Sequence, residues 1–97
     1  MSKIRKSARG EDCSVRLPGV CNFNNETTVL AHLPSNAKGI GKKSNDITSC
    51  YCCSDCHDVI DGRRKSDFSE LYILIAIYDA MVETQLKLID KGLIKIA

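Results

Sequence analysis

Six cysteines in a chain of 97 residues constrain this protein more than any other feature of its sequence. A domain of this length buries only a modest core, so a metal site or a disulfide adds much to its stability. The first residues include basic side chains, but no apolar segment follows them, so we expect no secretory signal and a cytoplasmic location. Cysteines in a reducing cytosol favour metal binding over disulfide formation.

Four of the cysteines form two pairs whose spacing is typical of a structural zinc site. Cys53 and Cys56 are separated by two residues, which allows both thiolates to reach one ion from a tight turn. Cys13 and Cys21 are further apart, but the Leu-Pro-Gly sequence at 17–19 can fold the chain back between them. We therefore predict one tetrahedral structural Zn²⁺ site made by Cys13, Cys21, Cys53 and Cys56.

The remaining two cysteines, Cys50 and Cys52, leave an alternative open. They are two residues apart and would share one face of a strand, while Cys53 would point to the other face. One interpretation treats both as small buried apolar residues or free thiols. The competing interpretation exchanges one of the four zinc ligands for Cys50 or Cys52.

We interpret the chain as a single domain, residues 1–97, with three segments. Residues 1–12 are polar and basic and are predicted to form an N-terminal arm or a short first turn. Residues 13–65 contain every cysteine and both histidines, and are predicted to form the zinc-braced core. Residues 66–97 are predicted to contain a long helix and a short tail. The expected fold class is therefore α+β, a small zinc-braced domain with a long C-terminal helix.

Short regular elements are predicted inside the zinc-braced segment. Residues 27–32 and 47–52 are predicted as short strands, the first because it is rich in β-formers and stops before a proline. Residues 54–63 are predicted as a helix that begins just after the Cys53 position. Residues 35–45, with glycines among lysines, are expected to form an exposed loop.

The clearest element is a helix over residues 66–91, with Ser66 or Asp67 as its N-terminal cap and Gly92 as its stop. Residues at helical spacing predict its buried stripe, which contains Phe68, Leu71, Ile75, Tyr78, Val82, Leu86 and Ile89.

The opposite, solvent-facing side of this helix is marked by Glu70, Glu83 and Lys87, and it also carries Ile73 and Ile77. Exposed apolar residues on that side predict a partner surface, and we expect a homodimer through Ile73 and Ile77. The alternative is that other parts of the chain cover these two side chains.

Charge is nearly balanced, with 14 basic and 12 acidic residues and a net charge of +2, which does not by itself indicate a nucleic-acid-binding protein. The longest apolar run, 71–78, is too short to span a bilayer, so no membrane partner is expected. Three basic clusters could converge on one face and follow a phosphate backbone, the alternative being scattered solvated charge. They are Lys3, Arg5, Lys6 and Arg9; Lys38, Lys42 and Lys43; and Arg63, Arg64 and Lys65.

The histidines lie near these elements. His57 and Asp61 are four residues apart and would share one helix face, where an imidazole and a carboxylate can bind a divalent cation with water completing the shell. The alternative is a hydrogen-bonded pair at a helix surface. His32 ends the first predicted strand, and a lone histidine is usually structural.

Together these motifs resemble the HNH, or ββα-metal, nucleases, in which a β-hairpin carries a histidine base and the following helix supplies metal ligands. The chain is similar in particular to small phage and prophage nucleases of the YbcO type. The resemblance lies within residues 3–65, and its matching stretches are 9–13, 16–22, 29–32 and 53–61.

This resemblance implies a metal-dependent endonuclease that hydrolyses DNA in phage DNA processing or recombination. His32 would be the general base, and His57 and Asp61 would hold a catalytic Mg²⁺, Mn²⁺ or Zn²⁺. The residue that orients the base is expected to be Asp46, with Asn45 as the alternative. The lysines and arginines expected to contact DNA phosphates are Lys38, Lys42, Lys43, Arg63 and Arg64.

One departure from the family pattern bears on activity. The position before the base usually holds an acidic residue or a histidine as a further metal ligand, and here it is Ala31. The catalytic ion would then have two protein ligands and bind weakly, unless Asp46 also contributes. A second functional hypothesis follows, in which the domain binds nucleic acid or a partner protein without cleaving it. A third, weaker one is a structural dimer made through the long helix.

Overall fold

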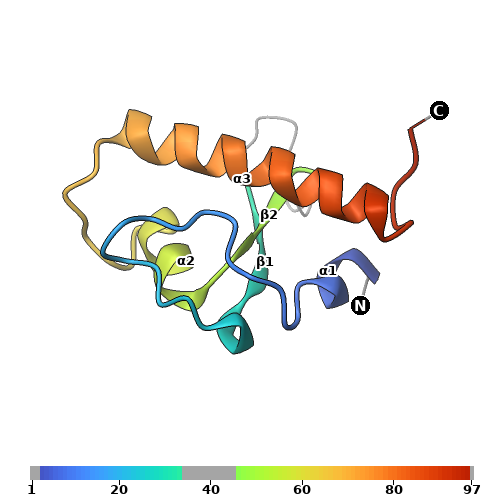
Figure 1. The fold of residues 1–97 in the computed structure, drawn as a ribbon. Helices are drawn as coiled ribbons and strands as arrows, with labels where there is room; N and C mark the ends of the chain where they lie inside the picture. The colour runs from blue at the N-terminus through green and yellow to red at the C-terminus, as the bar shows by residue number, and fades with distance from the viewer. Residues whose placement is uncertain (1–2, 34–45, 97) are drawn as a thin grey trace, which may run out of the picture.

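The computed structural model describes residues 3–33 and 46–96, and it confirms a small α+β architecture. A two-stranded sheet lies in the middle, with a long helix packed against it and shorter helices at either end (Figure 1). The elements in chain order are α1 (Lys3–Ser7), the 3₁₀ turn η1 (Asn25–Thr27), β1 (Val29–His32), β2 (Ser49–Cys52), α2 (Ser54–Ile60) and α3 (Glu70–Asp90).

The two strands are antiparallel, with Val29 opposite Cys52 and His32 opposite Ser49. The first strand begins two residues later than predicted because Asn24 caps η1, and its side chain accepts a hydrogen bond from the backbone N–H of Glu26. All four residues of β2 are buried. This burial explains why β2 contains small and aromatic residues rather than an alternation of polar and apolar ones.

The free edge of β2 is closed by contacts from outside the sheet. Tyr51 donates its backbone N–H to Thr84 Oγ1 of α3 at 3.0 Å, and its carbonyl accepts the N–H of Ser14 at 2.9 Å. An unpaired strand edge would otherwise expose these backbone groups or leave them buried without partners. The hydrogen bond from the N–H of Tyr51 to Thr84 therefore fixes the position of α3 along β2.

Helix α3 begins later than predicted. Its cap is Ser69, whose hydroxyl accepts the N–H of Tyr72 at 3.1 Å, so the predicted caps Ser66 and Asp67 are wrong. The predicted stop is confirmed, since the helix ends at Asp90 and Gly92 follows with φ +73°.

The predicted buried stripe of α3 is also wrong. The core side of the helix consists of Ile77, Ala80, Thr84 and Leu88, whereas most of the predicted stripe is exposed. Both sets recur at helical spacing, so periodicity alone does not separate them. Ala80 and Thr84 face β2 because small side chains allow close approach and Thr84 supplies the acceptor for Tyr51. The exposed large apolar residues of the helix are Leu71, Tyr72, Leu74, Ile75, Tyr78, Val82 and Leu86.

The predicted dimer surface at Ile73 and Ile77 is a consequence of the same error. Ile77 is buried in the core, and Ile73 is partly buried against it, so other parts of the chain cover both. Ile77 is therefore closed to a second copy, and Ile73 is only partly accessible. Glu83 and Lys87, predicted to mark the solvent side, instead flank the core side, where Glu83 pairs with Arg16 at 2.9 Å.

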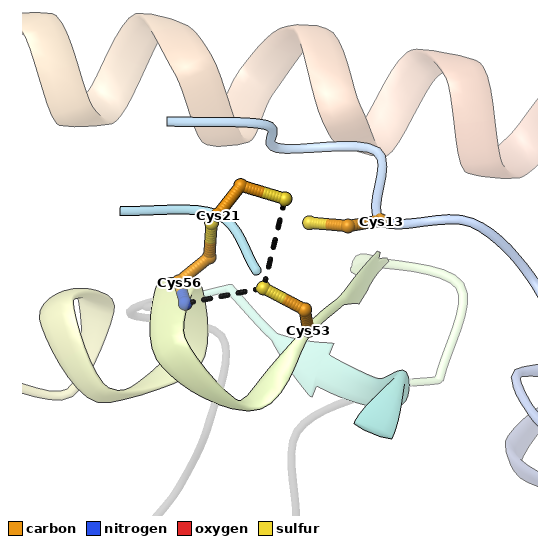
Figure 2. A group of neighbouring side chains, drawn as sticks. All are labelled: Cys13, Cys21, Cys53 and Cys56. Carbon is orange, nitrogen blue, oxygen red and sulfur yellow. Dashed lines mark hydrogen bonds between the residues drawn. The ribbon is translucent and has the colours of Figure 1, made fainter. Parts of the chain in front are cut away.

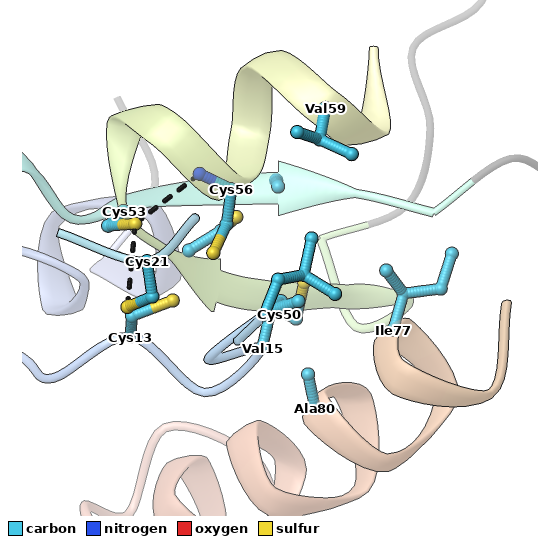
Figure 3. Close-up of a cluster of buried hydrophobic side chains, with 12 residues drawn as sticks. Cys13, Val15, Cys21, Cys50, Cys53, Cys56, Val59, Ile77 and Ala80 are labelled. Carbon is cyan, nitrogen blue, oxygen red and sulfur yellow. Dashed lines mark hydrogen bonds between the residues drawn. The ribbon is translucent and has the colours of Figure 1, made fainter. Parts of the chain in front are cut away.

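Two clusters of buried side chains make up the core. The larger contains all six cysteines, together with apolar residues of α2 and α3 such as Val59, Ile77 and Ala80 (Figure 3). The smaller lies at the other end of α3 and joins Ala8, Leu30, Tyr51 and Leu88. Tyr51 also shares a 2.7 Å hydrogen bond with Ser7 of α1, so the segment predicted as an arm or a short first turn begins with a short helix packed on this cluster.

Within residues 3–33 and 46–96, every helix is too short or too polar to pass through a lipid bilayer.

Removal of buried methyl groups at Leu88 tests the smaller cluster. Leu88 is fully buried, so Leu88→Ala should lower the free energy of unfolding by about 2–5 kcal/mol through lost burial and a cavity. Denaturant unfolding measures this change. Ile96→Ala is the control, because Ile96 is exposed, and it should change stability by less than about 0.5 kcal/mol. Equal effects of the two substitutions would contradict the assigned core.

Candidate functional site

Four cysteine sulfurs from two separate segments meet between the N-terminal loop and the start of α2. The sulfurs of Cys13, Cys21, Cys53 and Cys56 all lie within 4.8 Å of one another, and all four residues are buried. Figure 2 shows Cys13 and Cys21 reaching in from the loop and Cys53 and Cys56 from the first turn of α2. Four sulfurs closed off from water form the donor set of a structural Zn²⁺ site, so the residues fit this metal.

The loop between Cys13 and Cys21 folds back as its sequence suggests. The carbonyl of Leu17 accepts the N–H groups of Val20 and Cys21 at 3.0 and 2.9 Å, which closes a turn. Gly19 lies in this turn with φ +73°, a conformation that a side chain would strain. The turn directs Cys21 toward Cys53, and their sulfurs are 3.8 Å apart.

Cys53 has a second role, since it is the N-terminal cap of α2. Its sulfur accepts the backbone N–H of Cys56 at 3.4 Å. Cys13 plays a comparable part in the loop, where its sulfur accepts the N–H of Arg16 at 3.5 Å. Hydrogen bonds of this kind stabilise negative charge on sulfur, which a metal ligand requires.

The thiols differ in how readily they lose a proton. Hydrogen bonds from the thiols of Cys52 and Cys56 hold the pKa of Cys13 far below its usual range. Burial raises the pKa of Cys21 to about 11. Without a metal, the cluster thus concentrates negative charge on Cys13 while Cys21 keeps its proton at neutral pH.

The two remaining cysteines are buried beside this cluster. Interaction with the thiols of Cys13 and Cys50, together with burial, raises the pKa of Cys52 above its usual range. The four-sulfur group itself contains neither of them. The structure thus groups the four cysteines predicted from spacing, with Cys52 as the nearest further thiol.

A histidine and a carboxylate meet at the end of the hairpin. His32, the last residue of β1, lies with its Nε2 2.7 Å from Oδ1 of Asp46. The backbone fixes this pair, because the N–H of Leu33 bonds to the carbonyl of Thr48 at 2.9 Å. Both side chains of the pair remain about a quarter exposed. If Nε2 carries the proton donated to Asp46, Nδ1 is left as an acceptor.

A second pair lies on α2. Nε2 of His57 is 3.1 Å from Oδ2 of Asp61, which agrees with their predicted place on one helix face. Oδ2 of Asp61 is also 3.1 Å from a guanidinium nitrogen of Arg63. Among the residues that the structure describes, no third His, Cys, Asp or Glu completes a ligand group with this pair. Asp61 is thus shared between a histidine and an arginine.

The helix that carries the second pair follows the hairpin directly, since α2 begins two residues after β2 ends. Helix α2 starts next to Cys52 at the far end of β2 and runs back in the direction of β1, as Figure 3 shows. The order of hairpin and helix is the one that the sequence predicts.

The predicted nucleic-acid-binding residues are only partly described. Arg63 pairs with Asp58 as well as Asp61, and Arg64 pairs with Asp55 at 3.4 Å. Both arginines remain about half exposed, so their outer sides are free for further contacts. Lys38, Lys42 and Lys43 lie outside the described residues.

Two contacts were missed at the sequence level. The contact between Arg63 and Asp61 is signalled by Gly62, whose φ of +78° ends α2 and turns the chain back over its last turn. The pair of Arg16 and Glu83, which joins the cysteine loop to α3 through two hydrogen bonds, spans 67 positions and has no local signal.

Comparison with known proteins gives one consistent result. A family model described as "Putative nuclease YbcO" matches residues 2–92. Curated proteins with the same description from Escherichia coli (strain K12) and Enterobacteria phage 82 are each 42% identical over 97 residues, covering 98% of this chain and 99% of theirs. A solved structure, "Structure of a putative bacteriophage protein from Escherichia coli str. K-12 substr. MG1655", matches with a TM-score of 0.77 and 41% identity, covering 93% of this chain and all of that chain.

Substitution of single cysteines tests the metal site. The purified chain should contain one zinc per molecule, and Cys56→Ala should lose it together with much of the thermal stability. Cys50→Ala is the matched control, because Cys50 is equally buried but outside the four-sulfur group, and it should retain zinc. Elemental analysis and thermal unfolding measure both quantities. Loss of zinc in Cys50→Ala with retention in Cys56→Ala would overturn the ligand set.

Zinc affinity should fall as the pH falls. Burial raises the pKa of Cys21 to about 11, so this thiol is protonated at neutral pH and must release its proton when zinc binds. Each proton released weakens apparent affinity about tenfold per unit drop in pH. Competition with a chromophoric chelator between pH 6.5 and 8 measures the slope. An affinity that stays constant over this range would contradict binding to protonated thiols.

Proposed function

The chain belongs to the family described as "Putative nuclease YbcO", and from this membership we propose that it is a metal-dependent endonuclease that hydrolyses phosphodiester bonds in DNA. The observation that carries the proposal is the pair of His32 and Asp46 at the end of the hairpin where β1 ends and β2 begins. A hairpin that ends in this pair, followed by a helix with His57 and Asp61, is the arrangement expected of an HNH-type site.

His32 is the proposed general base. Donation of its Nε2–H to Asp46, 2.7 Å away, fixes the ring and leaves Nδ1 free to accept a proton. A water molecule that loses its proton to Nδ1 would attack the phosphorus atom. The partial exposure of both side chains supports this role, because a substrate and a water molecule need access to the ring.

His57 and Asp61 are the proposed ligands of a catalytic divalent cation. One imidazole nitrogen and one carboxylate oxygen 3.1 Å apart fit a single ion whose remaining positions are filled by water. Such an ion would stabilise negative charge on the phosphate and on the leaving oxygen. Ala31 adds no ligand, so weak binding is expected.

The proposed substrate contacts come from basic residues that follow α2 in the chain. Arg63 and Arg64 keep about half of their side-chain surface exposed, which suits contact with phosphate oxygens. The relative from Enterobacteria phage 82 supports a role in phage DNA processing. A DNA substrate of this kind would place the protein in the cytoplasm.

A second candidate is a domain that binds nucleic acid without cleaving it. The observation that favours it is the ion pair between Asp61 and Arg63. In addition, no third His, Cys, Asp or Glu among the described residues lies close enough to Asp61 and His57 to complete a metal-ligand group. This candidate predicts DNA binding with no cleavage in any divalent cation. The nuclease is preferred because a binding domain gives no role to the pair of His32 and Asp46.

Two histidine substitutions separate the roles. His32→Ala should lower the rate of plasmid nicking by about 10²–10⁴-fold at saturating Mg²⁺ or Mn²⁺, because the general base is lost. His57→Ala should instead raise the metal concentration needed for half-maximal activity. Zinc content and thermal unfolding serve as controls for the fold. Equal cleavage by His32→Ala and the parent would remove His32 as the base.

A further inference from the structure

One face of α3 is apolar and uncovered in the described structure. Helix positions that point away from the sheet carry six large apolar side chains, each at least 40% exposed. Glu83 forms ion pairs with Arg16 and Lys87 on the side of the helix next to the core, so these pairs do not cover the apolar face. The six, with their exposed fractions, are Leu71 67%, Leu74 54%, Ile75 54%, Tyr78 60%, Val82 40% and Leu86 62%.

The area of this face is large for a chain of this size. The six side chains leave on the order of 600 Å² of apolar surface exposed, which is at the upper end for the largest patch on a soluble monomer. Two such faces pressed together would bury on the order of 1,200 Å², and a specific interface needs about 1,000 Å². The face alone is thus sufficient for a dimer.

The spacing of the face is nearly symmetric about its centre. Counted from Tyr78, apolar residues lie three, four and seven positions before it and four and eight positions after it. A two-fold symmetric interface requires a surface that is complementary to itself, because each residue meets its counterpart across the axis. Two antiparallel copies of α3 would bring Leu71 of each copy next to Leu86 of the other, with Tyr78 at the axis.

Charge along the edges of the face disfavours other occupants. Asp79 and Asp90 are exposed on one edge, four residues after Ile75 and Leu86 respectively, and Glu70 is exposed on the other. Acidic edges repel nucleic acid and anionic lipid, and an interfacial membrane helix would carry lysine or arginine there. We propose that this face binds a second copy of the chain, with the two α3 helices antiparallel. The proposal does not depend on the proposed nuclease activity.

Sedimentation equilibrium on the zinc-loaded chain tests the proposal. The parent should pass from monomer to dimer across the micromolar range, and added salt should favour the dimer because Asp79 of both copies lies near the axis. Tyr78→Glu should raise the dimer dissociation constant at least about thirtyfold, as expected for loss of a central aromatic anchor. Ile96→Glu is the matched control, since Ile96 is 81% exposed but lies beyond α3, and it should dimerise like the parent.

A charge exchange tests the antiparallel orientation. Leu71→Lys and Leu86→Glu should each weaken self-association. An equimolar mixture of the two variants should restore dimers, because the ammonium group introduced at position 71 of one chain then meets the carboxylate introduced at position 86 of the other. A parallel pair would give no such rescue. A parent protein that stays monomeric at high concentration would overturn the proposal and indicate that a different protein binds this face. A dimer that persists in the Tyr78→Glu variant would also overturn it.

Discussion

Contact among four buried cysteine sulfurs is the interaction on which the rest of the structure depends. It joins a loop that has no helix or strand between Cys13 and Cys21 to the first turn of α2. Because Cys53 is also the N-terminal cap of α2, the same sulfur atom both joins the four-sulfur group and caps the helix. The position of His57 and Asp61 on that helix thus follows from the geometry of the cysteines.

The second constraint is the close packing of α3 against the free edge of β2. Thr84 accepts the N–H of Tyr51, and the fully buried Ala80 allows the backbones to approach. A backbone group that would otherwise lack a partner thereby selects which face of α3 turns inward. The apolar face left outside is therefore a consequence of hydrogen bonding, since hydrophobicity alone favours burying either face.

The sequence predicts those parts of the fold that have local causes. Cysteine spacing predicts the four-sulfur group, and Gly92 predicts the end of α3. The predicted inward face of α3 was wrong for two reasons. Two apolar stripes share one period, and the hydrogen bond from the N–H of Tyr51 to Thr84 joins residues far apart in the sequence. The pairing of His32 with Asp46 was suggested only through resemblance, since the sequence between them has no periodic signal.

The contact between Arg63 and Asp61 has a thermodynamic consequence for any cation that binds near α2. Asp61 cannot give its full charge to a divalent ion while the guanidinium stays 3.1 Å away, so the two cations compete for one carboxylate. A phosphate that drew Arg63 away would return that charge to Asp61. Binding of a phosphodiester and binding of a metal ion would then be linked, each strengthening the other by the same factor.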